Sequence, residues 1–253
     1  MSGHSKWSTI KRKKGANDAK RGKMFTKLIR EITVAARDGG ADENSNIRLR
    51  TAVQNARAAN MPLSTVERAI KRGSGQEEGT SFEEGLYEGY GPGGVAIMVE
   101  TLTDNKNRTV SEVRHIFSKH GGNLAETGAV SWMFEQKGTL EVNKIEINSD
   151  DLLMLVLDAG AEDIQDGEEV HELVTTVSAF GDVKKVLEIK EIGFGQASLS
   201  WIPKGENLLE VEVDQVSKII RLLESLEDLD DVQNVYSNFD LNEDVLDAVV
   251  TLQ

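Results

Sequence analysis

The stretch AEDIQDGEEVHELV, residues 161–174, decides the fold of the middle of this chain. Within it, Asp166-Gly167 separates two strand-like runs, and an Asp-Gly pair in this position is a strong signal for a tight hairpin. The elements predicted around the hairpin are a strand beginning at 139–142, a Leu-rich helix at 150–159, a helix at 179–190 and a strand at 196–202. Residues 138–202 therefore follow the order β-α-β-β-α-β of a ferredoxin-like domain.

The segments on both sides of this unit also alternate between strand and helix patterns. Before it, strands at 95–101 and 129–135 flank a helix at 109–120; after it, strands at 208–213 and 232–236 flank a helix at 215–226. Lys137-Gly138 is predicted as a turn. We expect the two flanks to form a second ferredoxin-like domain, with the first inserted in place of its central hairpin. The alternative is three β-α-β units in one mixed sheet.

Three amphipathic helices are predicted before residue 75. The first buries Phe25, Leu28, Ile29, Ile32 and Ala36 and ends at Gly39-Gly40. The second covers about 44–60 and is stopped by Pro62. The third opens with a capping box at Ser64-Thr65-Val66-Glu67 and ends at Gly73. Residues 73–94 are rich in glycine and are predicted as a junction with one short strand at 86–90.

The expected fold is therefore α+β and multidomain, with an N-terminal three-helix bundle followed by two ferredoxin-like α+β domains, one inserted in the other. The domains expected are a basic helical domain with an N-terminal arm (1–75), a discontinuous α+β domain (76–136 plus 205–240), an inserted α+β domain (137–204) and a C-terminal tail or short helix (241–253).

Charge is divided sharply along the chain. Residues 1–75 contain seventeen Lys and Arg against six Asp and Glu, a net charge of +11, although the whole chain carries −14. Residues 76–253 consequently carry −25. A basic block on an acidic protein favours binding of a polyanion over a general role in solubility.

The composition argues against several other classes of protein. There is no cysteine, which excludes disulfides, thiolate catalysis and cysteine-ligated zinc. No stretch approaches the roughly 18 apolar residues of a membrane span, and the N-terminus lacks the apolar core of a secretory signal.

His115 and His120 are five residues apart on a predicted helix, so they do not share a metal-binding face. The glycines at 89–94 precede a strand and lack a following Gly-Lys-Ser/Thr, which predicts a tight turn and not a phosphate loop. We expect a cytoplasmic protein that is not an enzyme, with no cofactor, metal, membrane or small-molecule substrate.

The basic block supplies the candidate binding residues. Trp7 and Ile10 lie within its densest run, and a Trp beside Lys and Arg can stack on a base. The predicted nucleic-acid-binding residues are Lys6, Trp7, Lys11, Arg12, Lys13, Lys14, Lys20, Arg21 and Lys23. An inert solvated tail is the first alternative. Membrane-surface binding is weaker, because Trp7 and Ile10 offer little apolar area.

Motifs along nearly the whole chain resemble the YebC/PmpR family. They are GHSKW (3–7), IK (10–11), DAKRGK (18–23), FTK (25–27), NIRLR (46–50), ANMP (59–62), YEGYGPGG (87–94), DNKNRT (104–109) and GGNL (121–124). The chain departs from the family at Ala125 and Ala129, where the family often has Gly, and we expect only local effects on loops. The resemblance implies a cytoplasmic bacterial protein of one helical and two α+β domains that is not an enzyme.

The same resemblance implies two functions. Members are described as probable transcriptional regulators that bind DNA. A mitochondrial relative activates translation of a cytochrome oxidase subunit, and bacterial members are also described at the ribosome, where they assist synthesis of proline-rich stretches. The residues favour the second function, a translation factor that binds ribosomal RNA, because no base-reading helix stands out and the −25 remainder repels extended duplex. The family description favours DNA.

Overall fold

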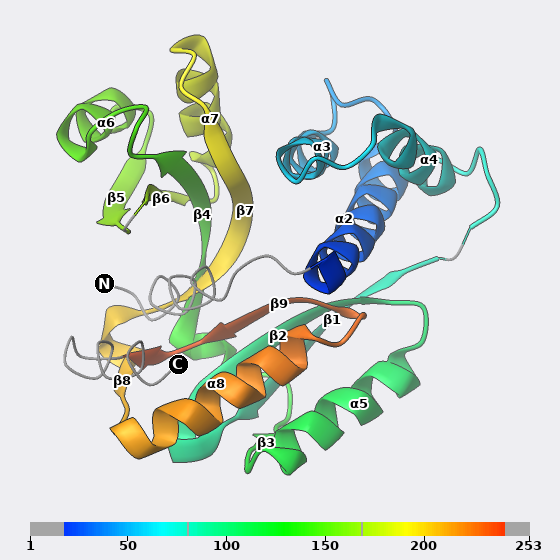
Figure 1. Ribbon diagram of the computed structural model, residues 1–253, viewed down its shortest axis with the longest axis vertical. Coiled ribbons are helices and arrows are strands. Elements are labelled where there is room, and N and C mark those ends of the chain that lie inside the picture. The colour runs from blue at the N-terminus through cyan, green and yellow to red at the C-terminus, as the bar shows by residue number, and fades with distance from the viewer. Residues whose placement is uncertain (1–17, 80, 168, 241–253) are drawn as a thin grey trace. The chain divides into compact units, whose positions relative to one another are not determined.

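The computed structural model of the protein describes residues 18–79, 81–167 and 169–240 (Figure 1). Its helices are α2 (Asp18–Gly39), α3 (Ile47–Ala58), α4 (Leu63–Gly73), α5 (Lys106–Lys119), α6 (Ser149–Val156), α7 (Phe180–Ile189) and α8 (Val213–Glu227), with short 3₁₀ turns η1 (Pro92–Gly94), η2 (Ser131–Met133) and η3 (Gly205–Asn207). Its strands are β1 (Glu83–Tyr90), β2 (Ala96–Thr103), β3 (Asn123–Leu124), β4 (Phe134–Asn143), β5 (Ala161–Asp166), β6 (Val170–Thr176), β7 (Phe194–Pro203), β8 (Leu209–Glu210), β9 (Val232–Ser237) and β10 (Phe239–Asp240). A helical region precedes the sheets, which confirms the predicted α+β class. The N-terminal arm before residue 18 and the predicted C-terminal tail or short helix (241–253) lie outside the described residues.

Two compact units contain these elements. One comprises residues 31–78 and 136–201, and the other comprises residues 18–30, 79–135 and 202–240 of the described chain. The division falls inside α2, so this helix contributes to both. The three-domain boundaries predicted from the sequence stay a proposal.

The helical region is held by small and branched apolar side chains. Residues of α2, α3 and α4 form its core: Ile32, Val34, Ala35, Ala36, Leu49, Ala52, Val53, Ala56, Val66 and Ala69 are all nearly inaccessible to solvent. Helix α3 begins after Asn46, whose side chain accepts a hydrogen bond from the Leu49 amide and donates to the carbonyls of Ala35 and Gly40. The predicted capping box is wrong. Helix α4 begins at Leu63, and the cap position is Pro62, whose carbonyl accepts from the Thr65 amide.

The inserted sheet contains strands in the order β5-β6-β4-β7. Its chain order β4-α6-β5-β6-α7-β7 matches the predicted β-α-β-β-α-β, and Asp166 pairs with His171 across the predicted hairpin. The predicted turn at Lys137-Gly138 is wrong, because both residues lie within β4 and pair with β6. Gly138 is required there for packing, since a Cβ atom would overlap the Phe180 side chain.

The outer sheet contains strands in the order β3-β1-β2-β9, with antiparallel pairing throughout. Helices α5 and α8 lie side by side against it (Figure 1), and their apolar faces share one core with β2 and β9. Strand β1 pairs with β2 over its whole length, so the segment predicted as a junction is a central strand. Gly89 permits this, because a Cβ there would meet the Phe117 ring.

Two strands predicted for the outer sheet are wrong. Residues 208–213 provide only β8, which pairs in parallel with β10 outside the four-stranded sheet, and β1 is the strand that joins the sheet beside β2. Within the strand predicted at 129–135, residues 131–133 form η2, and only Phe134 and Glu135 are extended, as the start of β4. The buried Glu88 carboxylate accepts hydrogen bonds from the amides of Gly128, Val130 and Ser131 at 2.7–2.8 Å, which withdraws those amides from sheet pairing. The short β3 takes the edge position instead.

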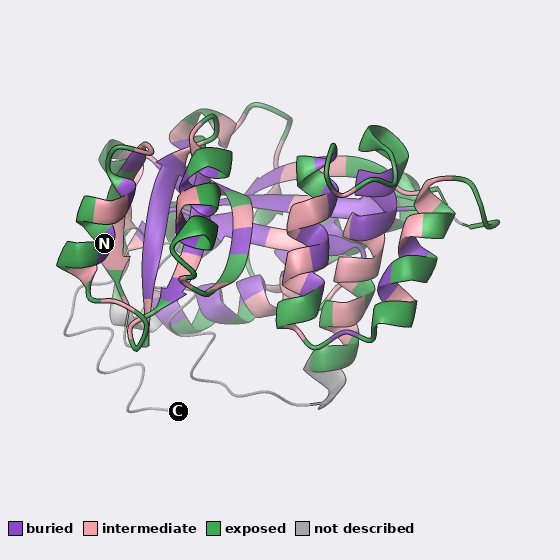
Figure 2. Ribbon diagram, turned by 90° about the horizontal axis from the view of Figure 1, so that it is seen from above, coloured by how far each residue is buried: buried purple, intermediate pink, exposed green. Residues whose placement is uncertain are grey.

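Burial follows this architecture. In Figure 2 the strands are largely buried, whereas the outer faces of the helices are exposed. Among the helices that the structure describes, none is both long enough and apolar enough to cross a membrane.

Candidate nucleic-acid interface

Few of the predicted binding residues have described side chains. Lys6, Trp7 and the run from Lys11 to Lys14 lie outside the described residues, and Lys20 is described only as part of the α2 backbone. Arg21 is exposed on α2, with its guanidinium 5.4 Å from the centroid of the Phe25 ring.

Lys23 has an acidic partner from the far end of the chain. Its Nζ lies 2.8 Å from Asp228 Oδ1, and the two side chains are 42% and 67% exposed. A pair this exposed contributes little to stability. Lys23 therefore stays accessible to a phosphate, although Asp228 offsets part of its charge.

Two further α2 cations are committed to the fold. Lys27 Nζ donates to the carbonyl of Glu227 at 3.0 Å. Arg30 donates to the carbonyl of Leu102 at 2.8 Å and to Asp231 Oδ1 at 2.7 Å. Lys27 and Arg30 therefore serve the fold, because their hydrogen bonds hold the first half of α2 within the unit that contains the outer sheet.

Asp231 is the centre of this attachment. Its carboxylate is buried and accepts from Arg30, from Arg108 at 2.6 Å, from Thr109 at 2.7 Å and from Thr103 at 3.1 Å. Burial alone would raise the pKa of Asp231, but the hydrogen bonds from Arg108, Thr109 and Arg30 outweigh it and hold the pKa below its ordinary value. The hydrogen bonds that Arg108 donates to Asp231 and Asp104 raise the pKa of Arg108. Sequence patterns give no sign of a contact between residues 201 positions apart.

A separate basic face lies on α4. Arg68, Lys71 and Arg72 are exposed and spaced at i, i+3 and i+4, opposite the buried Val66 and Ala69. This spacing brings the three cations onto one side of the helix. Within the part of the chain that the structure describes, none of the three has an acidic partner. Their position near the helix C-terminus also complements the helix dipole.

Other cations of the helical region are neutralised locally. Arg48 Nε lies 2.7 Å from Glu31 Oε1, and Arg57 Nη2 lies 3.5 Å from Glu43 Oε2. The sequence could have identified the α4 face from its helical spacing. It could not show that the α4 cations lack carboxylate partners among the described residues, whereas Arg48 and Arg57 of α3 have such partners.

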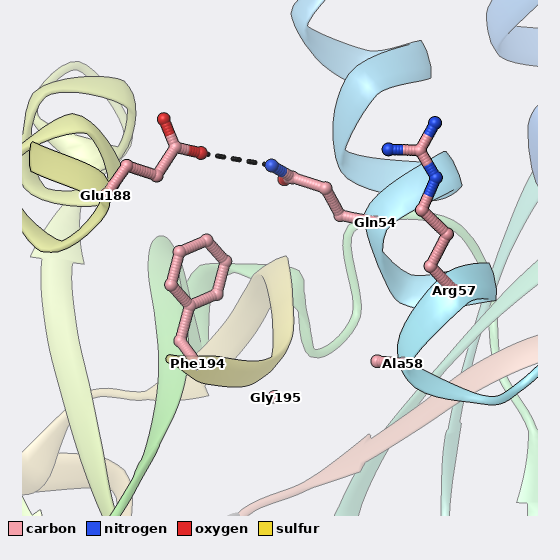
Figure 3. A pocket seen from close by; sticks show the side chains of 6 residues that line it. All are labelled: Gln54, Arg57, Ala58, Glu188, Phe194 and Gly195. Atoms are coloured by element: carbon pink, nitrogen blue, oxygen red, sulfur yellow. Dashed lines mark hydrogen bonds between the residues drawn. The ribbon is translucent and has the colours of Figure 1, made fainter. Parts of the chain in front are cut away.

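A hollow of about 310 Å³ lies in the unit that contains α3 and the inserted sheet (Figure 3). It is lined by Gln54, Arg57, Ala58, Glu188, Phe194 and Gly195. The buried Lys184 donates to Gln54 Oε1 at 2.7 Å, and Gln54 Nε2 donates to Glu188 Oε1 at 3.0 Å. Burial lowers the pKa of Lys184 to about 8. Because the polar groups around the hollow bind one another, their arrangement serves packing and presents no acid–base pair to a ligand.

The remaining motifs are structural in the described chain. Pro92–Gly94 forms a tight turn from β1 into β2, with Gly93 and Gly94 at φ of +74° and +81°, as predicted. His171 binds Asp166 at 2.5 Å and the carbonyl of Ile147 at 3.0 Å. Among the described residues, no three His, Asp or Glu side chains are grouped so that they could hold a metal ion.

Comparison with known proteins assigns the chain to a family. Residues 5–76 match the family model described as the TACO1/YebC protein N-terminal domain, and residues 82–239 match the TACO1/YebC second and third domain. The chain belongs to the TACO1/YebC family. This confirms the resemblance found from the motifs.

Relatives of the TACO1/YebC family match over almost their full length. Proteins from Desulfotalea psychrophila and Chlorobaculum parvum are 55% and 52% identical over 98% of this chain and 99% of their own, and both are named as a "Probable transcriptional regulatory protein". A crystal structure of a conserved hypothetical protein from Aquifex aeolicus is 50% identical, with a TM-score of 0.84 over 89% of this chain and 93% of that one. The relatives' names describe regulators of gene expression.

Ala125 and Ala129, the two positions at which the motifs led us to expect Gly, are accommodated without strain. Neither Ala125 nor Ala129 has a positive φ, so an L side chain fits at both. The carbonyl of Ala129 accepts hydrogen bonds from Tyr90 Oη at 3.0 Å and from Trp132 Nε1 at 3.1 Å.

Proposed function

We propose that this protein is a DNA-binding regulator of gene expression that contacts the phosphate backbone through its basic N-terminal region. The observation that carries the proposal is the unpaired basic face of α4, formed by Arg68, Lys71 and Arg72 in the described chain. These side chains belong to the +11 segment of a chain whose remainder carries −25. A segment whose exposed cations have no acidic partner, on a protein that is otherwise acidic, is suited to bind a polyanion. The relatives are named as probable transcriptional regulatory proteins, and because transcription is regulated on DNA, we take duplex DNA as the polyanion.

The exposed chemistry of α4 suits phosphate contact more than base reading. Beside its cations, α4 exposes Leu63, Ser64 and Glu67 but no Asn or Gln. Asn and Gln provide bidentate recognition of adenine, whereas Lys and Arg on one helix face bind backbone phosphates of any sequence. We therefore expect affinity from electrostatics, with strong dependence on salt.

The salt dependence of binding to duplex DNA tests this proposal. Each lost phosphate contact lowers the slope of log Kobs against log salt by about 0.9, so Arg68→Ala/Lys71→Ala/Arg72→Ala should reduce it by roughly 2 to 3. The matched control, Lys185→Ala/Lys190→Ala/Lys218→Ala, removes the same charge from exposed positions elsewhere. Replacing Lys11, Arg12, Lys13 and Lys14 with Ala measures the arm in the same way. Equal slopes for the α4 variant and its control would refute a contact through α4.

Ribosomal RNA is the second candidate target, favoured by the lack of a base-reading set on α4. Irregular RNA offers dense phosphates and unstacked bases, which backbone contacts and a Trp suit. Cell extract should be sedimented after DNase and, separately, after RNase treatment. Co-migration with ribosomal subunits that survives DNase supports the RNA target and a role in translation. Promoter footprinting without such co-migration supports the DNA target.

A further inference from the structure

Helix α6 exposes an apolar face that the fold does not explain. Residues 152–157 are six consecutive apolar residues, of which Leu152 and Val156 are buried against the inserted sheet. On the opposite side Met154 is 73% exposed, Leu157 57% and Leu153 37%. These three side chains are spaced at i, i+1 and i+4, so they adjoin one another on the helix surface.

The neighbouring helix of the same domain shows the ordinary pattern. Helix α7 buries Val183 and Leu187 against the same core and exposes Asp182, Lys185 and Glu188 over its middle turns. Polar residues are therefore compatible with the outside of a helix in this domain. The apolar outer face of α6 is a local feature, and a contiguous exposed apolar surface is typical of an interaction site.

Charge around α6 restricts the kind of partner. Residues 145–183 contain eleven Asp and Glu and no Lys or Arg. Three of these acids, Asp150, Asp151 and Asp158, are exposed on or beside α6. Asp163 is exposed on β5, which packs against it, whereas Glu162 on the same strand is paired with Lys137. An apolar centre with an acidic rim complements a segment that carries apolar residues between Lys and Arg.

We propose that the outer face of α6 docks a basic amphipathic segment of another protein. Leu153, Met154 and Leu157 form the apolar contact, and Asp150 and Asp158 attract the flanking cations. An amphipathic helix laid on this face would bury its apolar side and leave its charges at the rim. Two copies of this chain are a poorer pair, because α6 against α6 would place aspartates opposite aspartates. This proposal is independent of nucleic-acid binding by the N-terminal region.

A defined peptide tests the proposal on the full-length protein. The probe is a fluorescein-labelled amphipathic helix of about 18 residues, roughly 27 Å long, with Leu on one face and Lys on the other. Fluorescence anisotropy should show binding that weakens about tenfold or more in Met154→Ser/Leu157→Ser. The control Ile189→Ser removes an apolar side chain that is 68% exposed on α7 and should leave binding unchanged. Circular dichroism verifies that each variant is folded.

Further probes separate the apolar and charged contributions. A peptide with Glu in place of Lys, and one with Ser in place of Leu, should both bind at least tenfold more weakly than the probe. Asp150→Asn/Asp158→Asn should weaken the Lys peptide and reduce its salt dependence. Unchanged binding in Met154→Ser/Leu157→Ser, or an equal loss in Ile189→Ser, would overturn the proposal. A dimer in sedimentation that Met154→Ser/Leu157→Ser abolishes would also overturn it, in favour of a contact between two copies.

Discussion

Asp231→Asn is the substitution that tests most directly how the basic N-terminal helix is attached. Asp231 is 2% exposed, and its carboxylate binds Arg30, Arg108, Thr103 and Thr109. Asparagine has nearly the same shape but carries no charge, and it offers one acceptor oxygen where the carboxylate offers two. Its amide group would face side chains that are themselves donors.

The structure sets the size of the expected effect. Removal of one partner from a buried ion pair costs about 3 to 5 kcal/mol, because a charge is left unpaired. The Arg30 side chain is 13% exposed and should contribute fully, whereas Arg108 is 41% exposed, so water replaces part of its lost interaction. We expect a destabilisation of about 3 kcal/mol, which corresponds to a fall in Tm of roughly 6 to 12 °C.

Urea unfolding followed by far-UV circular dichroism measures this value. Asp228→Asn is the matched control, because it also removes an aspartate that binds an α2 cation, but its side chain is 67% exposed. The control should lose no more than about 0.5 kcal/mol. A loss below about 1 kcal/mol in Asp231→Asn, or equal losses in the two variants, would refute the central role of Asp231.

The effect also has a definite dependence on pH. The pKa of Asp231 lies below the ordinary value of 3.8, so its contribution is present in full above that value and disappears as pH falls through the lowered pKa. The difference in unfolding free energy between the wild type and Asp231→Asn should accordingly be constant near neutral pH and shrink below pH 3.8. A difference that stayed constant into strong acid would contradict this account.

Three further substitutions test other parts of the structure by urea unfolding. Burial lowers the pKa of Lys184 from 10.5 to about 8, so between these two pH values the unfolded state binds more protons than the folded state. The stability of the wild type relative to Lys184→Met should therefore rise by about 3 kcal/mol between neutral pH and pH 10.5. A stability difference that does not change with pH would contradict this. Glu88→Gln should lower the unfolding free energy by about 2 kcal/mol, because one amide oxygen replaces a carboxylate that binds three backbone amides. Unchanged stability would show that Glu88 does not hold the loop formed by residues 128–131. Gly138→Ala should cost about 1 to 3 kcal/mol through overlap with Phe180, whereas Gly181→Ala, whose added methyl group would have no neighbour within 4 Å, should be neutral or stabilising.

The sequence predicted the inserted domain well because its signals are local. Asp166-Gly167 specifies a hairpin through the φ/ψ preferences of two adjacent residues, and the flanking strands and helices differ clearly in period. The helical region was similarly readable from the spacing of its apolar residues. Errors there were small, such as the start of α4 at Leu63 instead of Ser64, because proline and serine both signal helix starts.

Two glycines within strands, and part of the outer sheet, were read less accurately because the contacts that decide them are long-range. Gly89 and Gly138 resemble turn residues in the sequence, but each lies in a strand where an aromatic ring packs directly on the backbone. Phe117 and Phe180, which supply those rings, are 28 and 42 residues further along the chain. Glu88 likewise prevents a strand before Phe134 by binding amides 40 to 43 residues away. Local pattern carries no information about such contacts.

The same distinction applies to the candidate interface. Composition and order alone determined that a basic segment precedes an acidic remainder, that three helices carry it and that α6 is rich in leucine, because these properties belong to the chain itself. Only the tertiary structure decided which of the described cations are free: Lys27 and Arg30 are bound within the fold, whereas Arg68, Lys71 and Arg72 are not. It also decided which α6 side chains face solvent. The reason is that burial and charge pairing depend on distances between residues that are far apart in sequence, and folding alone sets those distances.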